Sequence, residues 1–417
     1  MGKTIIEKII ADHCSEKVEP GSIVWIDIDV RSARDFGGAN VVKHLEKHYP
    51  NEQKIQNPEK TYFTFDCVVP ANNIGYAENQ QIARIFARKH LSRKNLFDVD
   101  SGIGSHVMIE KGIAIPGSTV VGTDSHLNIL GCIGAFGQGM GDQDIAFTFK
   151  TGKTWFEVPD TMTITINGTP AKNSSAKDVT LGVLELIGSK GALGKSIEFY
   201  GDTVNAFDLP GRITLASMVT EMGGIIGLMV PNDQIIEYCK KRSGKNFPIH
   251  TADSDASYTE QLDFDFEGLE PRIALPPSPE RVKPVSEVAG IKIDSVVIAS
   301  CTNGRYEDFA VVAKMLKGKK VHKDVMMKIV PSTQEVYGQL LKDGLIAIFY
   351  EAGAIISNPG CGGCASGQIG MTGEGEVQVS TGNRNFAGKQ GKGDTYLASP
   401  ATSTAAAIAG EITVPEF

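Results

Sequence analysis

Two hydrophobic periods alternate along the chain, one typical of helices and one typical of strands. Apolar residues at helical spacing predict a helix over roughly Thr4 to Asp12 and another over about Asn79 to Lys94. After the first helix, short runs rich in β-branched and aromatic residues, which favour strands, alternate with helical patterns. These predicted strands, each ending in a polar loop, cover Ile23 to Asp29, Tyr62 to Asp66 and Ser118 to Asp124.

The last third of the chain shows a regular series of strands and helices. Strand runs alternate there with helical patterns, which predicts a parallel sheet and an α/β fold. Ligands of such sheets bind beyond the carboxyl ends of the strands. The predicted strands are Ser295 to Ser300, Val325 to Val330, Ala354 to Ser357 and Glu376 to Ser380, and the predicted helices run from about Tyr306 to Leu316 and from about Gln334 to Leu341.

The stretch 247–290 separates these two parts of the chain. It is acidic at first and then proline-rich (ALPPSPERVKPVSEVAG), a composition typical of a surface crossing and linker. A chain of 417 residues suits two to three domains at about 100–200 residues each. We therefore predict a division into residues 1–285 and residues 286–417.

Composition and charge exclude several classes of protein. Hydrophobic residues make up 41% of the chain and charged residues 22%, which is typical of a folded globular protein. No uninterrupted apolar run reaches the roughly 18 residues of a membrane span, and the start of the chain, with its early acidic residues, does not resemble a secretory signal. The net charge of −8, without a long basic run, predicts no nucleic-acid partner.

Cysteine usage indicates a reducing compartment. Seven is an odd number of cysteines, and it is too few for a disulfide framework in a chain of this length. We therefore predict a cytoplasmic protein with no membrane association, whose reduced thiols serve metal or redox chemistry.

Three of these cysteines follow strands of one predicted sheet. Cys301 comes directly after the Ser295 to Ser300 strand, and Cys361 and Cys364 follow the Ala354 to Ser357 strand in the segment NPGCGGC. The three thiols can therefore converge at one edge of that sheet. Iron–sulfur clusters take thiolate ligands, usually four, so three would leave one iron open for a substrate. A zinc site, a redox-active C-x-x-C pair and purely structural cysteines are the alternatives.

Four motifs in order along the chain resemble those of one family. They are GTDSH at 122–126, SCTN around Cys301, NPGCGGC, and GNRNFAGKQG at 382–391. Together they resemble the aconitase superfamily, and most closely the separate large subunits of the 3-isopropylmalate dehydratase and homoaconitase type. The resemblance implies three α/β domains with parallel sheets around a cluster site. Domains 1 and 2 would be intertwined within 1–285, and domain 3, with the cluster ligands, would be 286–417.

The resemblance also implies a cofactor, a partner and an activity. One [4Fe–4S] cluster would be held by Cys301, Cys361 and Cys364. Single-chain aconitases carry a swivelling fourth domain with a Gly-Ser-Ser-Arg loop, and this sequence lacks that motif, so we expect a separate small subunit to supply it. The implied activity is that of a hydro-lyase, which dehydrates and rehydrates a small hydroxy diacid of the alkylmalate type, such as 3-isopropylmalate, dimethylmalate or citramalate.

The family motifs assign catalytic and substrate-binding residues one by one. The resemblance implies that His106 pairs with Asp124, and that both organise water and substrate with His126 around the open iron. Asp66 matches an aspartate that the family pairs with an acidic histidine, and Glu221 matches a glutamate near the cluster. Helix capping at the Asp124 segment and ordinary surface charge at the other positions are the alternatives. The implied substrate-binding residues are Ser125, Asn383, Arg384 and Lys389.

The chain departs from the family pattern at three positions near the expected substrate. Cys67 stands where the family has the histidine after Asp66, Ser217 replaces an asparagine, and Lys389 replaces a second arginine. Lysine keeps the charge but loses the bidentate fork, and the two smaller side chains leave room for alkyl groups. These departures favour a malate with two carboxylates. A hydratase that acts on a tricarboxylate, a cluster-free RNA-binding relative and a redox C-x-x-C protein are the alternatives.

Overall fold

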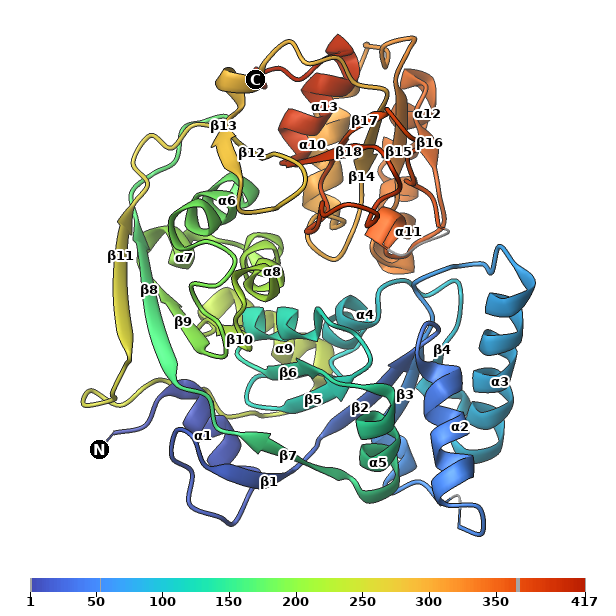
Figure 1. Cartoon of the computed structure of the whole chain (residues 1–417), viewed down its shortest axis with the longest axis vertical. Coiled ribbons are helices and arrows are strands. Elements are labelled where there is room, and N and C mark those ends of the chain that lie inside the picture. Colours follow the sequence, from blue (N-terminus) through green and yellow to red (C-terminus); the bar gives the residue numbers. More distant parts are fainter. Residues whose placement is uncertain (1, 53, 365–367, 417) are drawn as a thin grey trace.

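The computed structural model describes residues 2–52, 54–364 and 368–416, and the side chain of Cys364 lies outside this description. The described residues form four sheets with helices around them, which confirms the α/β class expected from the sequence. Figure 1 shows the C-terminal part of the chain, in orange and red, stacked on the blue and green remainder. Within the described residues, no helix is long and apolar enough to cross a membrane.

A five-stranded parallel sheet lies in the N-terminal part of the molecule. Its strands, in spatial order, are β4 (Leu96–Phe97), β3 (Thr61–Thr64), β2 (Val30–Arg34), β5 (Thr119–Gly122) and β6 (Phe136–Gly139). The helices packed around it are α2 (Gly38–His48), α3 (Ile74–His90) and α5 (Asp142–Thr151). The buried ring of Phe63 on β3 contacts Phe86 on α3 and Phe149 on α5 edge to face, which joins helices and sheet.

A four-stranded parallel sheet and a two-stranded antiparallel pair complete the first two thirds of the chain. The parallel strands are β10 (Ile226–Leu228), β9 (Ser196–Tyr200), β8 (Thr161–Asn167) and β11 (Glu260–Asp265), and the antiparallel pair is β1 (Ile23–Asp27) with β7 (Lys153–Glu157). The predicted first helix is confirmed as α1 (Ile5–Ala11), which Thr4 and Glu7 cap reciprocally. The other helices are α4 (Gly104–Glu110), α6 (Ala176–Ile187), α7 (Asp202–Ala206), α8 (Leu209–Met218) and α9 (Asp233–Ser243).

A seven-stranded sheet carries the C-terminal part. Its order is β13 (Val282–Pro284), β12 (Arg272–Ala274), β18 (Asp394–Ala398), β17 (Val377–Ser380), β14 (Ser295–Ile298), β15 (Met326–Ile329) and β16 (Ile355–Ile356). The four predicted strands, β14 to β17, are parallel as expected, β18 adds a fifth parallel strand, and β12 and β13 are antiparallel at one edge. The helices are α10 (Tyr306–Leu316), α11 (Gln334–Lys342), α12 (Leu345–Ala352) and α13 (Pro400–Ala409).

The prediction of a linker over 247–290 is wrong in part, because three strands lie in this stretch. Strand β11 forms an edge of the four-stranded sheet, and β12 and β13 extend the seven-stranded sheet, which therefore begins before residue 286. The alternation of Leu262, Phe264 and Phe266 with polar residues is the strand signal that the acidic composition obscured. These three side chains pack on the largest buried cluster of the protein.

Candidate active site

Cys301 lies just beyond the carboxyl end of β14. The chain turns at Ser300, whose φ of 84° lies in the left-handed region. The Cys301 sulfur accepts a hydrogen bond from Nδ2 of Asn383 at 3.4 Å and lies 3.8 Å from Oγ of Ser217. Both of these contacts are with uncharged polar groups.

Cys361 follows β16, two strands away in the same sheet, and its partners differ. Its backbone N–H donates to the carbonyl oxygen of Asp66 at 2.9 Å, and its sulfur accepts a hydrogen bond from Nη2 of Arg34 at 2.6 Å. At Gly362, with a φ of 63°, a Cβ would lie 2.7 Å from Cβ of Ala299. Glycine thus lets the cysteine loop pass close to the end of β14.

The third predicted ligand, Cys364, is described only in its backbone. It ends a short 3-10 helix, Gly362–Cys364, so the two cysteines of the C-x-x-C motif lie within one helical turn of each other. Its side chain is outside the described residues, and its role as a ligand stays a prediction.

The surroundings of the two described sulfurs fit an iron–sulfur cluster. N–H donors that bond to cysteine sulfur tune such clusters, and here an amide and a guanidinium point at the two sulfurs. A Cβ at Gly360 would lie 3.0 Å from the carbonyl oxygen of Asp66, so this loop is free of side chains where it passes the other sheet. The donor set is therefore compatible with the predicted cofactor.

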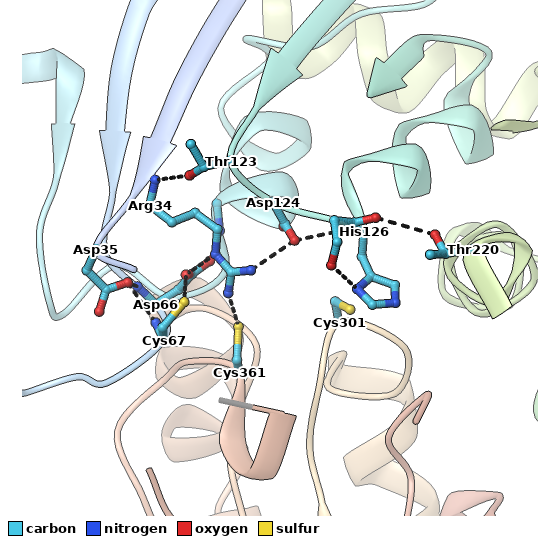
Figure 2. Close-up of polar contacts among 12 residues, drawn as sticks. Arg34, Asp35, Asp66, Cys67, Thr123, Asp124, His126, Thr220, Cys301 and Cys361 are labelled. Atoms are coloured by element: carbon cyan, nitrogen blue, oxygen red, sulfur yellow. Dashed lines mark hydrogen bonds and ion pairs between the residues drawn. The ribbon is translucent and has the colours of Figure 1, made fainter. Parts of the chain in front are cut away.

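Arg34, which the sequence analysis did not single out, joins the two sheets. It is the last residue of β2, and its guanidinium reaches Asp66 Oδ1 at 2.6 Å, Asp124 Oδ1 at 2.9 Å and the Cys361 sulfur. Figure 2 shows the guanidinium between these three side chains. One signal in the sequence could have identified Arg34. It is a basic residue at the end of a strand, and the neighbouring strands also end in functional side chains. The irregular pattern VRSAR concealed β2 itself.

Asp66 and Cys67 follow β3 and are buried. Asp66 Oδ2 accepts a hydrogen bond from the backbone N–H of Gly104 at 2.9 Å, and the Cys67 thiol lies 3.5 Å from Asp66 Oδ1. The carboxylate of Asp35 accepts the backbone N–H groups of Asp66, Cys67 and Val68, which fixes this turn. Burial raises the pKa of Asp66 above its usual value, although Arg34 opposes the rise.

Asp124, Ser125 and His126 follow β5, and a chain of contacts runs from them to the other sheet. His126 Nε2 is 3.0 Å from Glu221 Oε1, which also accepts a hydrogen bond from Nε of Arg384 at 2.7 Å. Although burial raises the pKa of a carboxyl group, Arg34 and then His126 hold the pKa of Asp124 below its usual value. The structure therefore brings together most of the residues that the motifs assigned to catalysis and substrate binding.

The predicted pairing of His106 with Asp124 is not formed as a hydrogen bond. His106 Nε2 instead bonds to the backbone carbonyl of Cys301 at 2.9 Å, and Nδ1 has no partner among the described residues. Burial, with the nearby charge of Arg305, lowers the pKa of His106 to about 3, so the imidazole is neutral. The contact made by His106 orients the cysteine loop.

Lys177, a second residue that the sequence analysis missed, supports the loop of Asn383 and Arg384. Its buried Nζ donates to the carbonyl oxygens of Gly382 at 2.6 Å and Thr381 at 3.3 Å. Burial lowers the pKa of this amine to about 7. A lysine in the first turn of a largely apolar helix was its sequence signal.

A cavity of about 470 Å³ opens beside these groups. Its charged and polar lining includes Lys389, the second of the two predicted substrate-binding cations, together with Arg34 and His126. The aromatic rings of Phe36, Tyr76 and Phe386 also border it, so the cavity is cationic on one part of its wall and apolar on another. Its lining residues are Arg34, Phe36, Cys67, Tyr76, Thr123, Ser125, His126, Phe386, Gly388 and Lys389.

Comparison with known proteins identifies the family of this chain. The aconitase family (aconitate hydratase) matches residues 7–290 and 283–410. The chain belongs to the aconitase family. The resemblance recognised in the four motifs is thereby confirmed over nearly the whole chain.

Members of the family with similar sequences are large subunits. The 3-isopropylmalate dehydratase large subunit 1 of Methanopyrus kandleri is 43% identical over 417 residues, which cover 100% of this chain and 99% of that protein. The probable methanogen homoaconitase large subunit of Methanothermobacter thermautotrophicus is 40% identical over 415 residues, 98% of this chain and 97% of that protein. Among solved structures, aconitase X of Thermococcus kodakaraensis matches with a TM-score of 0.52 at 14% identity, covering 87% of this chain and 84% of that one, which shows the shared fold.

Proposed function

We propose that this protein is the large subunit of a [4Fe–4S] hydro-lyase that dehydrates and rehydrates an alkylmalate-type hydroxy diacid. The observation that carries the proposal is the position of Cys301 and Cys361. Both sulfurs are buried, both accept N–H hydrogen bonds, and both lie at the carboxyl edge of one sheet next to acidic and cationic side chains of another. The names of the similar family members, mostly 3-isopropylmalate dehydratase large subunits, support the same activity.

The cluster ligands in this proposal are Cys301, Cys361 and Cys364. When bound, the cluster supplies a Lewis-acidic iron that polarises the substrate hydroxyl. Arg384 and Lys389 bind the substrate carboxylates through charge-assisted hydrogen bonds. The His126 imidazole, oriented by Glu221, would give a proton to the leaving hydroxyl and take one from the attacking water in the reverse reaction, and the Asp124 carboxylate would act as a proton acceptor.

A separate small subunit completes the site in this proposal. The similar family members are named large subunits, and this chain spans 97–100% of their lengths, which supports an equivalent division of labour here. The proposed partner adds groups to the open cavity beside Lys389 and His126. A cytoplasmic location suits the reduced thiols that cluster assembly needs.

The substrate class follows from the two sides of the cavity. The aromatic rings of Phe36, Tyr76 and Phe386 offer an apolar surface to an alkyl group, while Lys389 offers one charge without a bidentate fork. A diacid with a small alkyl substituent uses both sides. Each buried CH₂ contributes about 0.8 kcal/mol, so discrimination among alkylmalates is expected to be only severalfold per carbon.

The test is anaerobic reconstitution of the chain with iron, sulfide and its small subunit, followed by a kinetic panel read by ultraviolet absorbance of the unsaturated product. 3-Isopropylmalate, dimethylmalate and citramalate are expected to give the highest kcat/KM. A higher kcat/KM for citrate or homocitrate would overturn the proposed substrate class, but the proposed hydro-lyase reaction would stand. Absence of activity on every hydroxy acid in a fully iron-loaded complex would overturn the reaction class.

A further inference from the structure

We propose that Arg34 is a positioning residue for the cluster, and that its hydrogen bond to the Cys361 sulfur raises the reduction potential of the cluster and slows its loss of iron. This inference rests on the cluster of the proposed function. It concerns a residue that none of the recognised motifs contains, and it assigns a role to the arginine that ends β2.

The geometry of Arg34 is the first argument. Each nitrogen of its guanidinium contacts a different partner: Nε bonds to Asp66, Nη1 to Asp124 and Nη2 to Cys361. A guanidinium is planar and rigid, so these three contacts fix the partners relative to one another. The side chain is only 13% exposed, which leaves little freedom for another arrangement.

The charge of Arg34 is the second argument. Arginine does not deprotonate in proteins, and the carboxylates of Asp66 and Asp124 contact this guanidinium. The group is therefore a permanent cation, and its hydrogen bond to a thiolate is charge-assisted. Such a bond draws electron density from the sulfur, which favours the reduced, more negative cluster.

The contrast with Cys301 is the third argument. The Cys301 sulfur lies within hydrogen-bonding distance of the neutral side chains of Asn383 and Ser217. Cys361, in contrast, accepts a direct hydrogen bond from the cationic Arg34. Arg34 also links Cys361 to the carboxylates of Asp66 and Asp124 beside the substrate cavity. The positions of the sulfur and of both carboxylates therefore depend on this one side chain.

The experiment compares Arg34→Lys and Arg34→Gln with the unchanged protein, each reconstituted with its small subunit. The reduction potential of the cluster is measured by a redox titration followed by electron paramagnetic resonance, and iron release is followed with a chelator. Lysine keeps the positive charge but loses the planar fork whose three nitrogens reach three separate partners, whereas glutamine removes the charge. We expect a lower potential and about tenfold or faster iron release in both variants.

Arg212→Lys is the matched control. Arg212 is a fully buried arginine on α8 that donates hydrogen bonds to the backbone carbonyls of Phe207 and Val230. Its replacement is expected to leave the potential of the cluster unchanged even if thermal stability falls. Thermal unfolding of all variants separates a folding defect from an effect on the cluster.

The outcomes are distinct. A lower potential in both Arg34 variants supports the hydrogen bond, whereas a lower potential in Arg34→Gln alone shows that only charge matters and overturns it. An unchanged potential in both variants also overturns it. If the unchanged protein assembles no cluster, the proposed function itself fails, and that failure is visible before any variant is compared.

Discussion

Two sheet edges meet at the site, and they bring different chemistry to the same topological position. The five-stranded sheet ends in charged groups: Arg34 after β2, Asp66 after β3 and Asp124 after β5. The seven-stranded sheet ends in the sulfurs of Cys301 and Cys361 and in the amide of Asn383. The loops at the carboxyl ends of parallel strands can vary in sequence without changing the sheet. The same position in two sheets can therefore carry charged groups in one and sulfurs in the other.

This difference predicts that cofactor retention and proton transfer can be separated by mutation. Changes at the sulfur edge are expected to remove the metal, and changes at the charged edge are expected to leave it in place while activity falls. Arg34 is the exception, because it belongs to one edge and contacts the other.

The largest expected effect is at the sulfur edge. Cys301→Ser and Cys361→Ser are each expected to abolish the visible chromophore and all activity, since a hydroxyl is a poor ligand for cluster iron. The measurement is iron and sulfide content per chain. Cys239→Ser, which changes a buried thiol on α9 outside the site, is the control and is expected to keep its iron. Full iron content in Cys301→Ser would contradict the ligand assignment.

The next effect is at the charged edge. His126→Gln is expected to lower kcat by about 10²–10⁴-fold, the usual range for loss of a general acid or base, with iron content unchanged. Steady-state kinetics and iron analysis on the same sample make the measurement. His48→Gln, on the exposed end of α2, is the matched control. Loss of iron in His126→Gln would break the proposed separation of the two edges.

A smaller effect is expected where the chain departs from the family pattern. Lys389→Arg restores a bidentate fork in the cavity and is expected to raise the kcat/KM for citrate relative to 3-isopropylmalate by about fivefold, equivalent to about 1 kcal/mol. Lys392→Arg, at an exposed position of the same loop, is the control. If both variants keep the ratio of the unchanged enzyme, Lys389 does not set substrate preference.

The smallest effect concerns an ion pair away from both edges. His13 Nε2 lies 2.7 Å from Asp29 Oδ2 in the wall of a separate cavity of about 670 Å³. Burial opposes the charge on both groups, yet their hydrogen bond raises the pKa of His13 above 6.5 and lowers that of Asp29 from 3.8 to about 2.

These shifts fix the pH window in which the pair stabilises the fold. The contribution of His13 is complete below 6.5 and disappears as the pH rises through its raised pKa, while that of Asp29 is complete above 3.8 and disappears as the pH falls towards about 2. His13→Gln is therefore expected to lower the Tm most between pH 3.8 and pH 6.5, with kcat unchanged. A Tm difference that does not vary with pH would contradict the ion pair as its source.

Much of the fold was predictable because its signals are local. The periodicity of Tyr306–Leu316 gave a helix with the same bounds as α10, and the strand before Cys301 preceded a motif loop as expected. The linker prediction failed at β11, where acidic residues in the strand resembled the composition of a loop, and at β12 and β13, which lie in the proline-rich part of the stretch. The composition of a segment does not show which of its faces packs against the rest of the protein.

The site was predictable wherever a motif carries it, and it was not where a residue acts through partners distant in sequence. Arg34 forms a hydrogen bond with Cys361, which is 327 positions later in the chain. No sequence pattern around either residue predicts this contact. His106 was expected to contact Asp124, but the backbone carbonyl of Cys301 holds it instead. Backbone carbonyls have no signature in sequence, so contacts with them escape motif reasoning.

The distance between Arg34 and Cys361 along the chain also has a consequence for biosynthesis. At about 5–20 residues per second, a ribosome makes Arg34, Asp66 and Asp124 tens of seconds before it makes Cys361. During that interval the guanidinium can meet the two carboxylates but not the sulfur. A metal that needs Cys361 can therefore bind only after translation has passed that residue. By then Arg34, Asp66 and Asp124 have already had time to form their contacts.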